Sequence, residues 1–174
     1  MKKYELTAEF IEKWGKKLFR IKALISFGSV EAGELGGYVE KEDNLAQTGN
    51  AWVSGDARVY GDAWVSGNAW VSGNARVSGN ARVYGDAEVY GDARVCGDAW
   101  VSGDADYLLI GRIGSRFSFT TFFKNKDKGI TVSCGCFLGT IAEFRAKVTD
   151  THGNNKHAKM YNLAADMAEL QILG

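Results

Sequence analysis

The sequence predicts a mainly β protein built around a solenoid of short stacked strands, and two features of the chain support this. The first is a six-residue repeat, Ala-x-Val-x-Gly-(Asp/Asn), which continues from Gly49 to Ala105. A fixed short period is typical of solenoids, in which each unit buries its apolar face only by stacking on its neighbours. The second is the complete absence of proline beside 22 glycines. Proline cannot donate to a continuous ladder of backbone hydrogen bonds.

Each repeat combines one short strand with one tight turn. Valine is β-branched and suits a buried strand position, so we expect its two neighbours to point outward. Glycine followed by Asp or Asn is typical of turns, because these residues tolerate positive φ. Alanine then fits a crowded corner. The valine recurs without exception at Val53, Val59, Val65, Val71, Val77, Val83, Val89, Val95 and Val101.

This pattern resembles the hexapeptide repeat of left-handed parallel β-helices. The resemblance implies a triangular prism with three hexads in each coil, so that a coil takes about 18 residues. The segment Leu35–Glu40 fits the same register in a degenerate form. We therefore expect a left-handed β-helix over residues 35–106, with about four coils.

The two ends of the chain are expected to form separate units. Residues 1–34 hold no hexads and are predicted to be an N-terminal β cap with a strand over Leu18–Leu24. Solenoids need such caps because an open coil exposes unpaired strand edges. Residues 107–174 are predicted to be a small α+β domain. Its three expected strands cover residues 107–113, 116–123 and 129–136. The first expected helix runs from Thr140 to Gly153, and the second begins at Asn154 or Asn155.

The interval of one coil sorts the outward residues into three columns. The first holds Trp52, Trp70 and Glu88; the second holds Arg58, Arg76 and Arg94; and the third holds Trp64, Arg82 and Trp100. Tyr60 and Tyr84 flank the second and third columns. Each face of the prism is thus expected to have its own chemistry.

The arginine column suggests a binding strip. Like charges about 5 Å apart repel by about 1 kcal/mol in water, so something is expected to offset them. One interpretation is a strip that receives an anion or an acidic partner, because guanidinium groups match phosphate and carboxylate. The alternative is a solvated face balanced by the corner residues Asp56, Asn74 and Asp92.

The tryptophans suggest contact surfaces. Arg82 is expected to lie between the indoles of Trp64 and Trp100, which would form cation–π contacts. Outward tryptophans also point to an interface, because large exposed apolar groups usually contact something. We expect Trp52, Trp70, Trp64 and Trp100 to be contact aromatics. Self-association is the leading explanation, and the resemblance to hexapeptide-repeat proteins implies a homotrimer.

Composition narrows the class of partner. The formal net charge is zero, which argues against sequence-independent nucleic-acid binding. No stretch has the apolar length of a membrane span. Three cysteines, an odd number, do not form a disulfide framework, so we expect a cytoplasmic protein. No cofactor is expected.

A Cys2His2 metal site is conceivable from Cys134, Cys136, His152 and His157, but we favour buried thiols and a histidine at a helix C-terminus.

Two resemblances bear on function. Hexapeptide-repeat folds often belong to acyltransferases that use acyl-CoA and carry a catalytic histidine on the coils, but residues 49–105 hold no histidine. The whole chain more closely resembles small hexapeptide-repeat proteins of phages and prophages. The matching segments are Phe19–Leu24, Gly36–Glu40, Asn44–Leu45, Gly135–Phe137 and His152–Asn154.

The second resemblance implies binding in a host cytosol, such as sequestering a signalling nucleotide or blocking a defence protein. We therefore expect a non-catalytic protein that binds a small anionic, nucleotide-like ligand or a host protein. The candidate binding residues are Arg58, Arg76, Arg94, Arg82, Trp52, Trp70, Trp64, Trp100, Tyr60 and Tyr84. The alternatives are an acyltransferase and a structural or assembly module.

Overall fold

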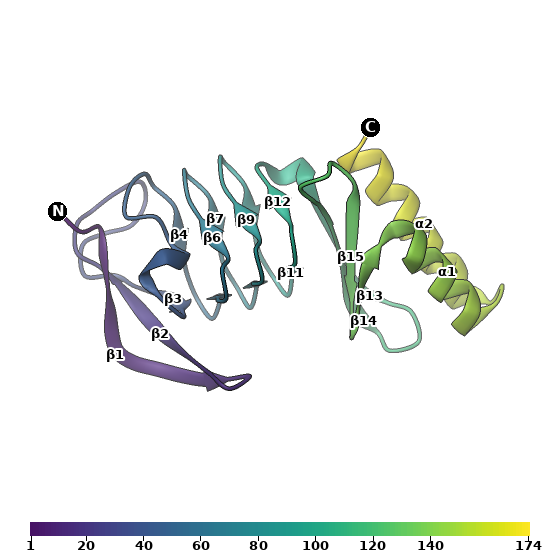
Figure 1. Ribbon diagram of the computed structural model, residues 1–174, viewed down its shortest axis with the longest axis horizontal. Helices are drawn as coiled ribbons and strands as arrows, with labels where there is room; N and C mark the ends of the chain where they lie inside the picture. The colour runs from purple at the N-terminus through teal and green to yellow at the C-terminus, as the bar shows by residue number, and fades with distance from the viewer.

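The computed structural model describes residues 1–174 and shows an elongated molecule (Figure 1). A β-solenoid of about four turns forms the middle, as the repeat predicts. An N-terminal hairpin lies at one end, and a four-stranded sheet with two helices lies at the other. The fold is therefore mainly β, with its helices confined to the C-terminal part.

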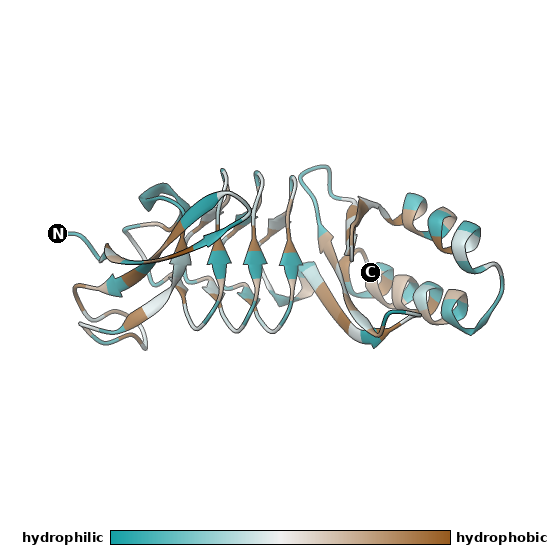
Figure 2. Ribbon diagram, turned by 90° about the horizontal axis from the view of Figure 1, so that it is seen from below, coloured by the Kyte–Doolittle hydropathy of each residue, from teal (hydrophilic) through white to brown (hydrophobic).

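The solenoid begins with β3 (Leu35–Val39) and continues through nine two-residue strands. Strands one coil apart pair in parallel, so Arg58 lies beside Arg76 and Arg76 beside Arg94. Figure 2 shows such strands stacked in register, each with a hydrophilic and a hydrophobic residue. The strands are β4 (Trp52–Val53), β5 (Arg58–Val59), β6 (Trp64–Val65), β7 (Trp70–Val71), β8 (Arg76–Val77), β9 (Arg82–Val83), β10 (Glu88–Val89), β11 (Arg94–Val95) and β12 (Trp100–Val101).

The interior of the solenoid consists of the repeated valines and of the repeated alanines from Ala51 to Ala99, all of which are at most 1% exposed. The glycines form the corners in the left-handed region, with Gly67 at φ 70°. A Cβ atom on Gly67 would lie 2.9 Å from the backbone nitrogen of Gly85. Only glycine therefore allows both the positive φ and the close approach of successive coils.

The N-terminal cap is a hairpin, whereas the sequence predicted only one strand there. Strand β1 (Tyr4–Lys13) pairs with β2 (Lys16–Ala23), and β2 pairs antiparallel with β3. Trp14 and Gly15 form the turn with φ values of 53° and 72°, which suits a two-residue hairpin turn. The hairpin thus extends the sheet that carries the arginine column. After β3, a short 3-10 helix, η1 (Glu42–Asn44), lies against the solenoid.

The C-terminal part has four strands, one more than predicted. After the 3-10 helix η2 (Asp104–Asp106) come β13 (Tyr107–Ile113), β14 (Ser118–Lys124), β15 (Ile130–Cys134) and β16 (Phe137–Thr140). The sequence prediction continued one strand through Cys136, but Gly135 and Cys136 form a hairpin turn. Cys134 and Cys136 therefore do not share a strand face, and Cys136 is exposed.

Two helices follow the sheet at the predicted positions. Helix α1 (Ile141–His152) begins with the expected capping box between Thr140 and Glu143 and ends at Gly153. Helix α2 (Lys156–Ile172) is capped by Asn155. Their buried faces cover the sheet and form a second apolar core. Neither helix has the length and apolarity needed to span a bilayer.

Lys3 gives the N-terminal cap a measurable dependence on pH. Its Nζ atom is buried and donates to the carbonyl oxygen of Ala51 at 2.8 Å. Burial lowers the pKa of Lys3 from 10.5 to about 8. Above pH 8 the folded protein thus loses a proton that the unfolded chain keeps, so stability rises with pH in this window.

We predict that the free energy of unfolding increases between about pH 8 and pH 10 relative to a Lys3→Met variant. Urea unfolding of both proteins at several pH values measures this difference. Parallel curves for the two proteins would show that Lys3 keeps its proton in the fold.

Candidate anion-binding site

The arginine column exists as the sequence predicts. Arg58, Arg76 and Arg94 occupy equivalent positions on β5, β8 and β11, with their adjacent valines in the core. Stacked parallel strands lie about 4.8 Å apart. The ladder therefore holds these side chains in one row.

The structure places a groove over part of this row. The hairpin β1–β2 runs beside the solenoid (Figure 1), and Trp14 at its tip forms one wall with Tyr60. The turn between β15 and β16 forms the opposite wall. We call this site of about 380 Å³ the arginine groove. It is lined by Trp14, Tyr60, Arg76, Ser78, Arg94, Cys96, Ser133, Gly135, Cys136, Phe137 and Leu138.

Arg76 is held in place by aromatic packing. Its guanidinium carbon lies 4.9 Å from the centre of the Trp14 ring, and Trp14 stacks on Tyr60 at 5.1 Å. Burial, followed by the charges of Arg94 and Arg58, lowers the pKa of Arg76. A bound anion would therefore stabilise the charged form of Arg76.

Arg94 is exposed at the other wall. One of its terminal nitrogens donates to the carbonyl oxygen of Gly135 at 3.2 Å. A guanidinium has five N–H donors, so this contact orients the side chain and leaves most donors available. Arg58 does not line the groove, and its buried Nε atom has no hydrogen-bond partner.

Carboxylates do not neutralise the row. None of the three column arginines forms an ion pair, and no Asp or Glu lines the arginine groove. At the corner, Asn74 donates to Asp92 at 3.2 Å. The charge of Asp92 raises the pKa of Arg76, but its effect is smaller than those of burial and of the other neighbouring charges. The corner residues thus offset the arginine charges weakly.

The N-terminal cap covers one end of the first column, whereas Glu88 at the other end is exposed. Trp52 is fully buried and packs edge-on against Tyr4 and Phe27. The prediction of Trp52 as a contact aromatic is therefore wrong. Trp70 is partly buried, and its indole nitrogen donates to Ser54 at 3.1 Å.

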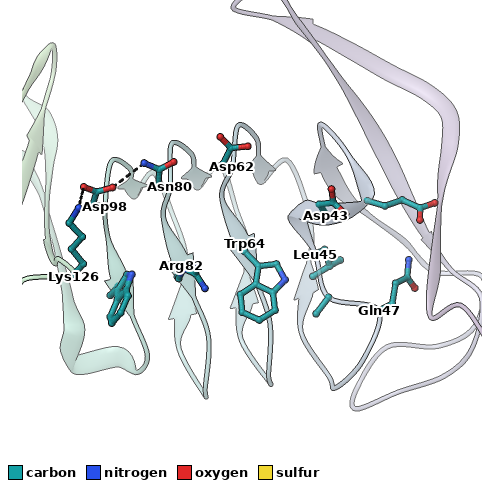
Figure 3. Close-up of a pocket in the computed structure, with 12 residues that line it drawn as sticks. Asp43, Leu45, Gln47, Asp62, Trp64, Asn80, Arg82, Asp98 and Lys126 are labelled. Atoms are coloured by element: carbon teal, nitrogen blue, oxygen red, sulfur yellow. Dashed lines mark hydrogen bonds and ion pairs between the residues drawn. The ribbon is translucent and has the colours of Figure 1, made fainter.

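The third column lines a wider groove of about 810 Å³ (Figure 3). Trp64 and Trp100 are 40% and 43% exposed. Arg82 forms a cation–π contact with Trp64, at 5.9 Å, but not with Trp100. The predicted sandwich is thus one-sided. Tyr84 lies on the same face, in a smaller recess beside Trp100.

Acidic side chains surround these tryptophans. Asp98 accepts hydrogen bonds from Lys126 at 2.8 Å and from Asn80 at 3.0 Å, as Figure 3 shows. The remaining acidic lining residues are Glu42, Asp43 and Asp62. Carboxylates outnumber cations here, so this groove suits an anion less well than the arginine groove does.

The conceivable metal site is not assembled. The structure has no group of three His, Cys, Asp or Glu side chains placed to hold a metal ion. Cys134 accepts a hydrogen bond from Thr120 at 3.2 Å, and Cys136 is exposed in its turn. Cys134, Cys136 and His152 line one recess, but His157 does not. Burial, followed by the neighbouring Cys134, raises the pKa of Tyr161 to about 12. His152 and His157 lie near this tyrosine, with their rings 5.8 Å apart.

The sequence predicts the arginines and Tyr60 of this groove but not the remaining residues of its walls. Trp14, Phe137 and Leu138 come from segments far from the repeat. A signal for Trp14 was present, because Trp-Gly lies between two alternating β segments and marks a hairpin turn. Nothing local in the sequence indicates that either wall reaches the arginine row.

Comparison with known families supports the repeat. Overlapping segments match a family described as the YdcK beta solenoid repeat, at residues 51–67, 57–73, 65–85, 75–91 and 87–103. These matches span residues 51–103, which is less than half of the chain. The middle of the chain is therefore similar to that repeat. No curated protein matches the chain.

The burial of Trp52 predicts a large difference between two tryptophans. We expect Trp52→Ala to reduce the free energy of unfolding by about 3–5 kcal/mol, because it opens a cavity beneath the cap. We expect the control Trp64→Ala to cost less than about 1 kcal/mol, since this side chain is partly exposed. Urea denaturation measures both. Equal losses would contradict the burial of Trp52 by the hairpin segment.

Proposed function

We propose that the protein binds a small anionic, nucleotide-like ligand in the arginine groove. The observation that carries this proposal is the pair of adjacent guanidinium groups, Arg76 and Arg94, in a groove without a carboxylate. The strands that carry them lie about 4.8 Å apart, so both guanidinium groups can bind oxygens of one phosphate or of two linked phosphates. The aromatic wall adds a surface on which a planar base can stack.

The walls support a small ligand rather than an extended surface. A volume of about 380 Å³ lies within the range of small-molecule sites, about 300–1,000 Å³. Trp14 fixes Arg76, and the carbonyl oxygen of Gly135 fixes Arg94. Prearranged side chains lose less conformational entropy on binding. Trp14 is half exposed and can still contact a ligand.

The proposed role is capture of the ligand without turnover. A phage-type protein that sequesters a host signalling nucleotide would need this chemistry, and the resemblance of the whole chain favours that context. A homotrimer and a host protein as the bound partner remain predictions from the sequence. The acyltransferase alternative gains no support from the arginine groove, because both histidines lie in or beside the C-terminal helices.

We predict that the double variant Arg76→Gln/Arg94→Gln binds pyrophosphate and GTP more weakly than the wild type. Each lost arginine should weaken binding about 10- to 100-fold, because each charge-assisted contact contributes about 1.5–3 kcal/mol. Isothermal titration calorimetry measures the affinities. Arg112→Gln, an exposed arginine on β13, is the matched control and should bind like the wild type. The proposal fails if the double variant binds both anions unchanged.

Cys136 offers a second test in the same groove. It is exposed and lines the wall beside Arg94. We predict that bound GTP slows the reaction of Cys136 with iodoacetamide, because the ligand covers the thiol. Mass spectrometry of the alkylated peptide measures the rate. An unchanged rate at saturating GTP would place the ligand elsewhere.

A further inference from the structure

Helix α2 carries apolar side chains on two opposite faces. Its inner face packs on the sheet through Ala158, Tyr161, Ala164, Ala165, Ala168 and Ile172, all of which are buried. Its other face exposes Met160, Leu163, Met167 and Leu170, at 40%, 63%, 55% and 77%. We call these four residues the outer stripe. A helix that is apolar on both faces normally has a partner on each.

The spacing of the outer stripe is that of a helix–helix seam. The four residues follow one another at intervals of three, four and three positions. This is the a/d pattern of a heptad, in which the side chains of one helix fit between those of another. Figure 1 shows α2 at the end of the molecule, where a second helix can approach it. Helix α1 occupies another side, through Arg145.

The charges on α2 indicate which charges a partner helix should carry. The first turn has no acidic residue and the last turn has no basic one, so neither end carries the charge that would stabilise the helix dipole. Lys156 and Lys159 lie near the N-terminus and form no ion pair. Toward the C-terminus, Asp166 and Glu169 share the single cation of Arg145, at 2.7 and 2.8 Å. One half of α2 is thus basic, and the other half keeps a negative charge.

We propose that two copies of this chain pair through the outer stripe, with their α2 helices antiparallel. This arrangement places the basic half of each helix beside the acidic half of the other and opposes their dipoles. A two-fold axis near the level of Ala165 puts Met160 opposite the second copy's Leu170 and Leu163 opposite its Met167. The same patch then serves both copies, as a two-fold interface requires.

The size of the stripe sets the strength of the pair. Four side chains from each helix bury less than the standard interface of about 1,600 Å². The dimer is therefore expected to dissociate at micromolar concentrations. The interface uses neither the arginine groove nor the tryptophan faces, so it is independent of the proposed ligand.

Sedimentation velocity over a range of concentrations tests the pairing. The expected result is a shift from a species of 18.9 kDa toward twice that mass as concentration rises. Leu163→Glu/Met167→Glu should remain monomeric. The control Leu24→Glu, which changes an exposed leucine beside the N-terminal hairpin, should dimerise like the wild type. Circular dichroism should show that the helices are retained in both variants. A wild type that stays monomeric, or a trimer that survives Leu163→Glu/Met167→Glu, would overturn the proposal.

Disulfide cross-linking tests the direction of the helices. The background is Cys136→Ser, which removes the exposed native thiol. Met160→Cys mixed with Leu170→Cys should form a covalent dimer under mild oxidation, whereas each alone should form little. Efficient self-linking of Met160→Cys would show parallel helices and would contradict the antiparallel pair.

Discussion

The hydrogen-bonded ladder between successive coils is the constraint on which the rest of this structure depends. Arg58 donates its backbone N–H to Ala75 at 2.9 Å, and Tyr60 donates to Val77 at 3.0 Å. The same pattern repeats along the prism. Because the ladder fixes the register, residues one coil apart must lie side by side. The corners can approach closely because they are glycine, and the interior closes because valine and alanine alternate there.

The ladder also creates the candidate site. Three arginines at equivalent positions are forced into one row, although their charges repel. The solenoid alone leaves this row on an open face. The hairpin tip and the β15–β16 turn flank it on two sides, so that Trp14 and Phe137, far apart in the sequence, line one groove with Arg76 and Arg94. Repetition supplies the charge in this candidate site, and the non-repetitive ends supply its walls.

The sequence was sufficient where the period controls the structure. It predicted the three columns, the buried valines, the capping box at Thr140 and the N-terminus of α2. It was insufficient where distant segments meet. Trp52 has the same local sequence as Trp70, but only Trp52 lies beneath Tyr4 and Phe27. The turn at Gly135 was missed because Cys-Gly-Cys is compatible with both a strand and a hairpin. The groove walls depend on tertiary packing that no local pattern encodes.

The most direct test of the arginine groove is nuclear magnetic resonance of its own side chains. Spectra of the arginine Nε–H groups and of the tryptophan indoles can be followed while pyrophosphate is added. The account predicts that the signals of Arg76, Arg94 and Trp14 shift together and saturate, while those of Arg112 and Trp52 stay fixed. Shifts that are absent at millimolar pyrophosphate, or that are spread over all arginines without saturation, would contradict a binding site in the groove.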